Sequence, residues 1–495
     1  MDAGSKALQG RNKFSMTGLI GGIGRRLIAD PQIVWLRRDL RMADQPALHA
    51  AAQAGPVIPL FVYDEQRGGD HAYGGASKVW LHHSLVSLGK SYGAHNSRIV
   101  LRRGGAPQVL AALADETGAT CIHAMRHYEP WWKEAEDELR DALAGSGGEE
   151  RRLCLYDGNY LLPPGSVTTG SGDPYKIYTP FAKSMLEVMP QRDPLPEPET
   201  LSSPDSWPDS DELADWALLP ANPDWAGGIR DFWEFGEQAA HDRLDWWADV
   251  VGDYDEGRNL PSEDTTSRLS PHLHWGEVSP AQVWHALKDK RSDGWNTFAK
   301  EVIWRDYAQN VIDQFPDYPR ESYRDYDERT LWRNPNAGHL IAQDFACWQK
   351  GMTGYPVVDA GMRQLWQTGW MHNRVRMICA SFLVKHLLID WRFGEQWYWD
   401  CLVDADYSNN GVNWQWISGT GVDSNMFVRI MAPLTQSEKF CAADYIREYV
   451  PELADLGDDC IHDPPDEKRG DYPVKMIGHR EARERALAAY RSAKG

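Results

Sequence analysis

The chain has 495 residues, enough for two or three domains with well-buried cores. Its formal net charge of −20 disfavours indiscriminate binding to polyanions, although the segment 205–256 alone carries 15 acidic and only two basic residues, which leaves room for a local basic surface elsewhere. The seven cysteines form no CxxC pair, which disfavours a disulfide framework or a cysteine metal site and favours a reducing cytoplasm. No apolar run approaches the ~20 residues of a membrane span, which disfavours a membrane protein.

Residues 1–30 include the stretch TGLIGGIGRRLIAD at positions 17–30. Its basic residues follow the short apolar part instead of preceding it, unlike a signal peptide. Its glycines follow no predicted strand, as a dinucleotide-binding fingerprint would require. We expect residues 1–30 to be an N-terminal extension translated from an upstream start codon.

Short apolar segments alternate with helix-period segments over residues 31–160. Five segments have the length and composition of buried strands: 32–36, 56–63, 98–102, 120–125 and 152–156. Helical stretches lie between them, at 76–92 and 130–145 among others. This alternation predicts a doubly wound parallel sheet with helices on both faces.

The second half of the chain has a different pattern. Residues 161–225 contain twelve prolines and little periodicity, which predicts a long interdomain linker. From residue 226 to 495 the apolar residues recur with helical spacing. The predicted architecture is therefore a two-domain α/β plus all-α protein, with an α/β domain at 31–160 and a helical domain at 226–495.

A run of hydroxyl residues with one arginine, Thr265 to Ser270, precedes a proline and a helical stretch. Such a turn can hold a phosphate through its hydroxyls and backbone amides. The alternative is that the run only caps a helix, which is the more common use of such residues and is favoured by the run alone.

Two further segments gather polar and aromatic side chains on helical faces. Glu301, Trp304 and Arg305 are spaced i, i+3, i+4 and are predicted to share one face. Residues 373–377 place an asparagine, two arginines and a methionine close together. Each set is compatible with a solvated salt bridge beside a core residue, or with a surface that stacks a base and binds a phosphate.

The segment DADYSNNGVNWQW at 404–416 contains two acids, three asparagines and two tryptophans. It has no histidine that could activate a nucleophile and no metal-ligand spacing. Hydrolase and metalloenzyme chemistry is therefore disfavoured, and no metal site is predicted.

Taken together and in order, these motifs resemble the photolyase/cryptochrome flavoproteins, most closely the bacterial class I-type photolyases of cyclobutane pyrimidine dimers. The resemblance extends from about residue 31 to the C-terminus. Its most specific stretches are VWLRRDLRMADQPAL (34–48), GSGDPYKIYTPFAK (170–183), TSRLSPHL (266–273), EVIWRDY (301–307), GMTGYPVVDAGMRQLWQTGWMHNRVRMICASFLVKHLLIDWRFGEQ (351–396) and DADYSNNGVNWQW (404–416).

The resemblance implies FAD in the helical domain, beneath a cavity that opens to DNA. It places the FAD phosphates at the hydroxyl-rich turn, against the helix-cap interpretation. The residues implied to contact the cofactor are Tyr254, Thr266, Ser267, Arg268, Leu269, Ser270, Asn373, Arg376, Asp404, Asp406 and Asn410. Arg376 and Asp404 are implied to form a buried ion pair whose guanidinium favours the anionic reduced flavin. Asn410 is implied to face flavin N5 with an amide that has no proton to give, although it could also merely close a turn.

The substrate side is implied to hold a pyrimidine dimer flipped out of UV-damaged DNA. The residues concerned are Glu301, Trp304, Arg305, Asn373, Arg374, Met377 and Trp416. Trp304 and Trp416 would form a flat wall for the dimer. Glu301 would stabilise the dimer after electron transfer has given it a charge. Arg374 would bind a backbone phosphate. The implied enzyme is a deoxyribodipyrimidine photo-lyase, a carbon–carbon lyase in which light drives an electron from reduced FAD to the dimer and back.

An electron path that reduces the flavin is implied at Trp414 and Trp391. Trp332 is the candidate for its third member, although the segment 331–348 is longer than in relatives. The loop 422–433 also departs from the usual family sequence.

A second, light-harvesting chromophore is implied near HYEPWWKE at 127–134. Trp131 and Trp132 differ from the residues of folate-binding relatives, so methenyltetrahydrofolate and 8-hydroxy-deazaflavin both stay open.

The main alternative is a cryptochrome-like blue-light receptor, against which Asn410 and the dimer-binding set argue. A (6-4) photolyase is disfavoured because Met377 stands where those enzymes carry histidine. DNA binding would need a positive surface despite the acidic net charge, formed by Arg305, Arg374, Arg376, Arg392 and Arg429. We expect a monomer in the bacterial cytosol that associates with the nucleoid when it repairs DNA.

Overall fold

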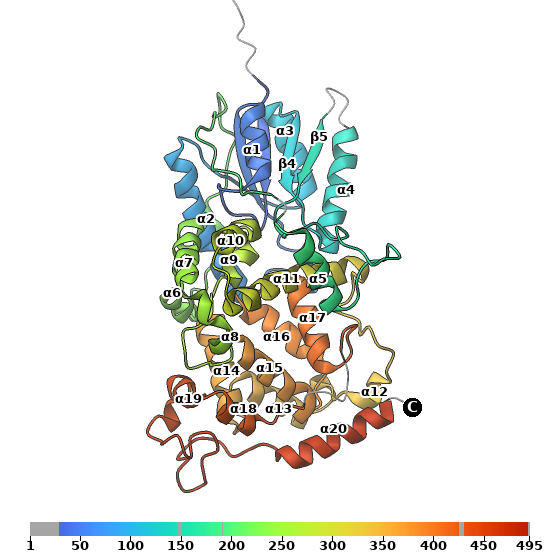
Figure 1. The fold of residues 1–495 in the computed structure, drawn as a ribbon. Helices are drawn as coiled ribbons and strands as arrows, with labels where there is room; N and C mark the ends of the chain where they lie inside the picture. Colours follow the sequence, from blue (N-terminus) through green and yellow to red (C-terminus); the bar gives the residue numbers. More distant parts are fainter. Residues whose placement is uncertain (1–28, 146–150, 191, 425–429, 494–495) are drawn as a thin grey trace, which may run out of the picture.

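The computed structural model describes residues 29–145, 151–190, 192–424 and 430–493. Figure 1 shows the sheet domain at one end of the molecule and the helical half at the other. The expected N-terminal extension lies, apart from its last two residues, outside the described residues, as does Arg429.

Five parallel strands form one sheet in the order β3-β2-β1-β4-β5. The strands are β1 (Gln32–Leu36), β2 (Val57–Tyr63), β3 (Val100–Arg103), β4 (Cys121–Met125) and β5 (Arg152–Tyr156). Every residue of β1, β2 and β4 is buried, which explains their continuous apolar sequences. The parallel sheet predicted from the alternation of segments is confirmed.

Helices cover both faces of this sheet. They are α1 (Pro46–Ala54), α2 (Gly75–Ala94), α3 (Ala106–Thr117) and α4 (Pro130–Gly145). Leu110 of α3 and Leu139 of α4 pack on the face that carries Trp35, whereas Leu48 of α1 and Leu85 of α2 pack on the opposite face. The strand order reverses at β1 and β4, so the loops after these two strands diverge and leave a crevice at their carboxyl ends.

The segment 161–225 is more ordered than its prolines predict. It contains helix α5 (Tyr178–Val188) and a short 3₁₀ turn, η2 (Leu213–Trp216). Phe181 of α5 packs in the core of the helical half, and Trp216 stacks on Tyr63 of the sheet with ring centroids 5.3 Å apart. The segment therefore contributes apolar side chains to both halves. We propose the boundaries 31–160, 161–225 and 226–495 as a division of the sequence.

The remaining chain is helical. Its α-helices are α6 (Gly227–Phe232), α7 (Glu237–Val250), α8 (Tyr254–Gly257), α9 (Ser270–Trp275), α10 (Pro280–Leu287), α11 (Asp293–Gln314), α12 (Glu328–Leu331), α13 (His339–Gln349), α14 (Pro356–Thr368), α15 (Asn373–Ser381), α16 (Trp391–Cys401), α17 (Tyr407–Ser418), α18 (Pro433–Lys439), α19 (Ala443–Tyr449) and α20 (His479–Ala493). A π-helical turn, η5 (Phe382–His386), follows α15, and 3₁₀ turns lie at η1 (Gly69–His71), η3 (Val251–Asp253), η4 (Pro335–Ala337) and η6 (Pro451–Leu453). In the described part of the chain, no helix has the length and apolar character to cross a membrane.

The two halves share one core across their junction. Trp275 of α9 and Val403 from the helical half pack in the same cluster as Leu36 and Trp80 of the α/β half. The indole of Trp275 also donates to the carbonyl of Val403. Because these side chains are buried only when both halves are docked, the junction is a fixed part of the fold.

The packing of α16 on α17 depends on a glycine at position 394. A Cβ atom there would lie 2.2 Å from the ring of Trp414 and 2.6 Å from Leu383. We expect Gly394→Ala to lower the free energy of unfolding by roughly 1–3 kcal/mol through overpacking. Gly89→Ala, in α2, meets no atom within 4 Å and should leave stability equal or raised. Denaturant unfolding of both variants checks this; equal stability of the two would contradict the packing.

Candidate functional site

The 404–416 segment surrounds the start of helix α17. Asp406 is the N-cap of this helix and accepts from the backbone N–H of Asn409 at 2.8 Å. Its other oxygen lies 3.5 Å from Arg38 and 3.6 Å from His274. Burial would raise the pKa of Asp406, but the hydrogen bond from His274 and the charge of Arg38 hold that pKa well below its usual range. A buried, ionised carboxylate is therefore fixed at the junction of the two halves.

Asp404 forms the predicted ion pair with Arg376 of α15. The guanidinium lies 2.9 and 3.1 Å from the two carboxylate oxygens, and its Nε donates to the carbonyl of Met371. The aspartate is almost completely buried, while a quarter of the arginine side chain stays exposed. The pair thus presents positive charge on its open side.

Asn410 points inward from α17 and is buried. Its Nδ2 donates to Oε1 of Glu395 at 2.8 Å and to the carbonyl of Glu395 at 3.1 Å. Because Glu395 only accepts hydrogen bonds when ionised, it fixes which end of the amide faces it. The interpretation of Asn410 as a simple turn residue is wrong, since it lies within the first turn of a helix.

The hydroxyl-rich turn precedes α9, which begins without a side-chain cap. Arg243 stabilises the turn by donating to the carbonyls of Thr266 and Ser267 at 2.8 and 2.7 Å. Arg268 has a left-handed backbone (φ 50°), and its Nε is buried without a hydrogen-bond partner among the described residues. The side-chain donors of this turn are therefore directed to something other than the helix that follows.

The remaining cofactor candidates lie around this turn. Thr265 donates to the carbonyl of Gly257 and so ties the turn to α8, whose first residue is Tyr254. Leu269 is fully buried and packs in the core, whereas Ser270 and Asn373 are exposed.

Glu301 and Trp304 both lie on α11, one helical turn apart. Glu301 pairs with Arg258 at 2.6 Å. Trp304 packs against Tyr178 of α5, and its indole N–H is buried without a hydrogen-bond partner among the described residues.

The side chain of Arg305 does not lie with those of Glu301 and Trp304. It donates to the carbonyls of Asn159 and Leu273 at 2.5 and 3.1 Å and lies over the ring of Tyr160. Its positive charge therefore tethers the helical half to the end of the α/β half.

Arg374 and Met377 lie one turn apart on α15. Arg374 donates to Oδ1 of Asn259 through Nε and Nη2 and stacks over Phe440. Its Nη1 lies 3.8 Å from the sulfur of Met377. Trp416 is half-buried on α17, which packs alongside α11. Arg374 of α15 is therefore held by Asn259, which follows α8.

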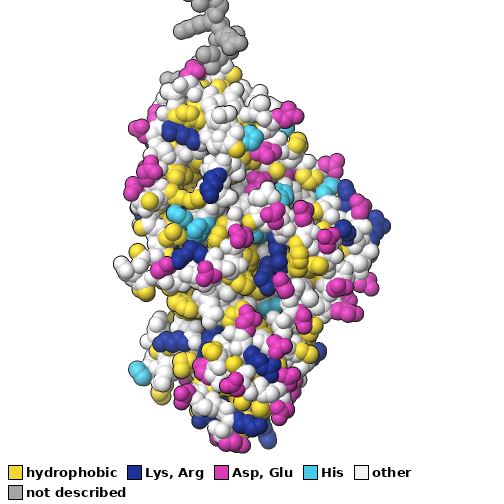
Figure 2. All heavy atoms as spheres, turned by 90° about the vertical axis from the view of Figure 1, so that its left-hand side faces the viewer, with side chains coloured by type: hydrophobic (Ala, Val, Ile, Leu, Met, Phe, Trp, Pro, Cys, Tyr) yellow, Lys and Arg dark blue, Asp and Glu magenta, His cyan; other side chains and the backbone are white. Residues whose placement is uncertain are grey.

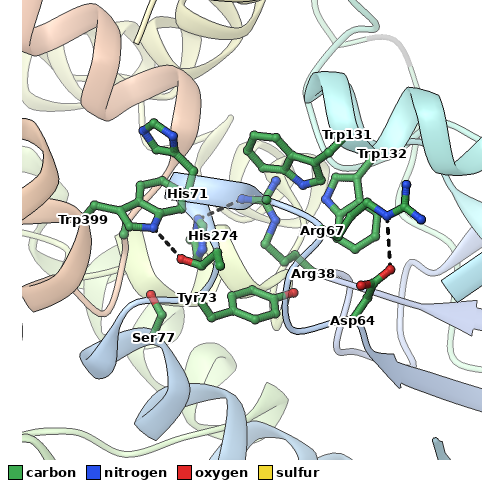
Figure 3. A pocket seen from close by; sticks show the side chains of 13 residues that line it. Arg38, Asp64, Arg67, His71, Tyr73, Ser77, Trp131, Trp132, His274 and Trp399 are labelled. Carbon is green, nitrogen blue, oxygen red and sulfur yellow. Dashed lines mark hydrogen bonds and ion pairs between the residues drawn. The ribbon is translucent and has the colours of Figure 1, made fainter. Parts of the chain in front are cut away.

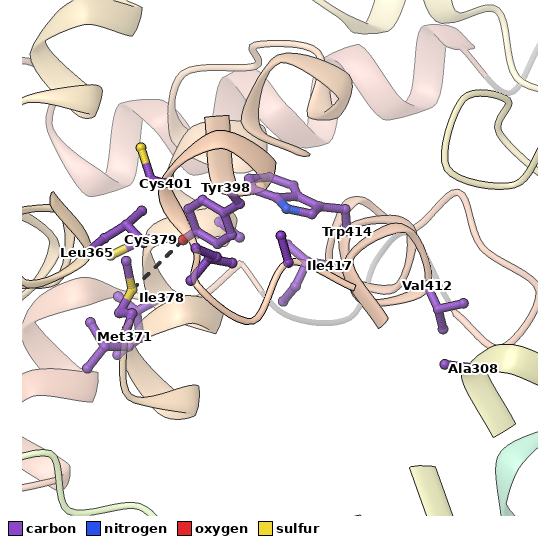
Figure 4. Packing of buried hydrophobic residues seen from close by; sticks show 14 of the residues in the cluster. Ala308, Leu365, Met371, Ile378, Cys379, Tyr398, Cys401, Val412, Trp414 and Ile417 are labelled. Carbon is purple, nitrogen blue, oxygen red and sulfur yellow. Dashed lines mark hydrogen bonds between the residues drawn. The ribbon is translucent and has the colours of Figure 1, made fainter. Parts of the chain in front are cut away.

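Trp414 and Trp391 are both buried. Figure 4 shows Trp414 beside Tyr398, with Met371 and Ile378 farther along the same cluster. The Trp414 ring lies 5.0 Å from that of Tyr398 and packs on α16 one turn beyond Trp391. Trp332 is half-buried; its neighbour Arg333 pairs with Ile389, just before α16. The three tryptophans therefore lie on elements that adjoin one another.

An interdomain pocket lies in the crevice where the strand order reverses. Figure 3 shows Trp131 and Trp132 on one side, His71 and Trp399 on the other, and Arg38 between them. The space between these side chains is about 440 Å³, a volume that includes space open to solvent. The pocket also includes Arg67, which pairs with Asp64 at 3.1 Å. Aromatic walls with basic side chains between them suit a flat ligand that carries negative charge.

Four residues of the site were missed from the sequence: Arg38, Arg258, His274 and Glu395. Arg38 belongs to the quoted WLRRDLR stretch, which gave no indication of where its side chain points. Glu395 stands 15 residues before Asn410, so no helical spacing relates them. Only the packing of α16 on α17 brings the two together.

Comparisons with known proteins agree with this geometry. The family described as DNA photolyase matches residues 32–199, and the FAD binding domain of DNA photolyase matches residues 298–492. The chain is 43% identical to the deoxyribodipyrimidine photo-lyase of Agrobacterium fabrum, over 94% of this chain and 98% of that one.

The chain belongs to the photolyase/cryptochrome family.

The chain is also similar to two other members of this family. The chain is similar to a crystal structure of a bacterial class III photolyase from Agrobacterium tumefaciens, with 42% identity, a TM-score of 0.89, and coverage of 96% of this chain and 100% of that one. It is also 33% identical to cryptochrome-1 of Arabidopsis thaliana, over 95% of this chain and 71% of the relative.

The donor set fits the FAD that this photolyase family binds. The unpartnered Nε of Arg268 lies at the turn assigned to the phosphates, and Nε2 of His372, just before α15, is likewise buried without a partner among the described residues. The guanidinium of Arg376 and the amide of Asn410 would hold the flavin, because one offers positive charge and the other a neutral hydrogen-bonding group. The described residues contain no group of three His, Cys, Asp or Glu side chains placed to hold a metal.

Of the five arginines expected to form a positive DNA surface, Arg429 lies outside the described residues, and three of the other four are held by contacts within the protein. Arg392 pairs with Asp390 and Glu328, Arg376 with Asp404, and Arg305 is tethered as described above. On the face in Figure 2, acidic side chains are spread among the basic ones from end to end. Among the described residues, Arg258 pairs with Glu301 and Arg374 contacts Met377, so both bring positive charge to the predicted substrate side.

The charge of Asp406 should be measurable as a pH-dependent stability. Its folded-state pKa lies below the unfolded value, so its stabilisation is complete above about pH 4 and is lost as pH falls through the folded-state pKa. We expect Asp406→Asn to lower the free energy of unfolding at pH 7 by about 3 kcal/mol, because Arg38 loses a buried partner. The deficit should shrink in denaturant titrations at pH 3.

Asp137→Asn provides the control. Asp137 is exposed, and among the described residues its ion pair is with Arg140 on its own helix, so its loss should leave stability unchanged at both pH values. An Asp406→Asn deficit that stays the same at pH 7 and pH 3 would contradict the ionised state of Asp406.

Proposed function

We propose that the protein is a deoxyribodipyrimidine photo-lyase, which uses light to split cyclobutane pyrimidine dimers in UV-damaged DNA. Bound FAD, reduced and anionic, would supply on illumination the electron that opens the dimer and that returns afterwards. Arg376 would favour the anionic cofactor by its positive charge, and Asp404 would hold that guanidinium in place. The main support is the buried amide of Asn410, which Glu395 anchors through a hydrogen bond of 2.8 Å.

A neutral amide at position 410 favours repair over signalling. An aspartate facing flavin N5 could give up a proton, whereas Asn410 can only form a hydrogen bond. The fold is shared by photolyases and cryptochromes, so the side chains around the cofactor must decide between them. We therefore keep the light receptor as the alternative.

The lesion would bind against Trp304 and Trp416, with Arg374 on a phosphate of the damaged strand. A flipped dimer offers its carbonyls to hydrogen-bond donors, and the indole N–H of Trp304, which has no partner among the described residues, is one such donor. Met377 packs beside Arg374 and offers no proton, which argues against a (6-4) photolyase. Trp414, Trp391 and Trp332 would carry electrons to the cofactor.

Within the family, the expected class I-type assignment lacks support. The similarity to the Agrobacterium class III photolyase favours class III, and we propose that group instead. All seven cysteines are free thiols, which supports a reducing bacterial cytosol, and we expect a monomer that visits nucleoid DNA.

A repair assay with matched asparagine variants tests this function. The purified protein, photoreduced with blue light and a thiol, should restore the absorbance of oligothymidylate that contains dimers. Asn410→Asp should slow repair at least about tenfold, equivalent to ~1.4 kcal/mol, because a carboxyl faces the cofactor. Asn413→Asp, on the exposed side of the same helix, should repair at the wild-type rate. If the protein binds flavin but repairs no dimers, the cryptochrome-like light receptor is favoured. If it repairs only (6-4) products, a (6-4) photolyase is favoured.

We further propose that the interdomain pocket binds the second, light-harvesting chromophore. Trp131 lies 4.8 Å from Tyr407, the residue after Asp406, so a ligand stacked there would adjoin the flavin site. The basic side chains Arg38 and Arg67 favour a ligand with carboxylate or phosphate groups. Methenyltetrahydrofolate and 8-hydroxy-deazaflavin both meet this description.

Removing one aromatic wall should separate light harvesting from repair. We expect Trp131→Ala to lose near-UV absorbance beyond that of FAD, and to lower repair several-fold at antenna wavelengths, while repair under light absorbed by FAD stays unchanged. Trp207→Ala serves as the control, because Trp207 lies away from the pocket, under Arg98. An unchanged chromophore content in Trp131→Ala would place the antenna elsewhere.

A further inference from the structure

His71 connects the α/β half directly to the residue that anchors Asn410. It ends the 3₁₀ turn η1 in the loop between β2 and α2, and only 3% of its surface is exposed. Trp399 and Tyr407 pack edge-on against its ring, with centroids 4.9 and 4.8 Å away. Figure 3 shows His71 beside Trp399. The imidazole is therefore held in one orientation inside the helical half.

The imidazole Nε2 lies 3.1 and 3.3 Å from the two carboxylate oxygens of Glu395. A carboxylate can only accept, so Nε2 carries the proton and donates it in this contact. Gln396 also donates to Glu395, at 3.1 Å. Glu395 is 1% exposed, which means that these few donors replace all of its contacts with water.

The third donor to Glu395 is the amide of Asn410. Because Nδ2 of Asn410 is directed to Glu395, its Oδ1 is left for the opposite side, where the proposed cofactor lies. If Glu395 moved, the two ends of the amide could exchange places. A bound flavin would then meet the N–H end of the amide instead of its carbonyl oxygen, and the stability of the protonated, reduced cofactor would change.

We propose that His71 is a positioning residue, which sets the orientation of the Asn410 amide by holding Glu395 in place. This inference rests on the proposed function, since it assumes that Asn410 faces the flavin. Its chemical requirement is a single N–H donor at the position of Nε2. In this arrangement His71, from the α/β half, acts on the flavin through two hydrogen bonds in series, from Nε2 to Glu395 and from Asn410 to Glu395.

Three variants separate the hydrogen bond from the packing. His71→Phe keeps an aromatic ring against Trp399 and Tyr407 but has no N–H. His71→Gln carries an amide N–H that can reach the position of Nε2. His83→Phe is the control, since His83 stacks on Phe235 in the same half of the protein, 4.5 Å between ring centroids.

Each variant is purified as the full chain and loaded with FAD. The rate of flavin photoreduction by blue light with a thiol is measured, together with the light-induced infrared difference spectrum in the amide carbonyl region. We expect His71→Phe to bind FAD in the wild-type ratio, to photoreduce about tenfold more slowly, as for a buried acceptor that loses one donor, and to shift the asparagine carbonyl band. His71→Gln should recover both signals, and His83→Phe should match the wild type.

Equal photoreduction rates and spectra in His71→Phe and wild type would overturn the inference while leaving the function standing, provided that the wild type repairs dimers. A wild type that binds no FAD would overturn both. If His71→Phe does not fold, His71→Asn replaces it, because the shorter amide falls short of Glu395. In that case His71→Gln and His71→Asn should differ about tenfold, and equal rates would overturn the inference.

Discussion

The buried charges at the junction of the two halves are the constraint on which the rest of this structure depends. Arg38, from the loop after β1, pairs with Glu129 and lies 3.5 Å from Asp406, which starts helix α17. Buried charges are costly unless paired, so the halves can dock only where these partners meet. The docking in turn fixes the N-terminus of α17, and with it the direction in which Asn410 points.

Around this junction the protein holds polar groups in a dry environment without a nucleophile. Asp404 holds the guanidinium of Arg376 in place, Glu395 anchors Asn410, and Asp406 stays ionised beside His274. Such groups shape the electrostatic potential around a cofactor and do not form bonds to a substrate. Electron transfer needs an environment of this kind, since it moves charge and leaves the protein chemically unchanged.

The two proposed ligand sites adjoin the same few residues. Tyr407 touches both Trp131 of the interdomain pocket and His71, which binds Glu395. The pocket lies at the carboxyl ends of the parallel strands, where the order of the strands reverses, as ligand sites commonly do in doubly wound sheets. Light capture and flavin chemistry would therefore share one rigid wall.

The sequence by itself determined the parallel sheet, the helical half and the residues of the 404–416 segment, because apolar periodicity and short motifs are local signals. It also determined the Arg376–Asp404 pair, through the family resemblance. Only the tertiary structure decided that Arg305 faces Asn159, that α5 packs in the core of the helical half, and that Glu395 and His71 hold Asn410. The physical reason is that these contacts join residues far apart in the chain, whose directions depend on how the helices pack against the sheet domain.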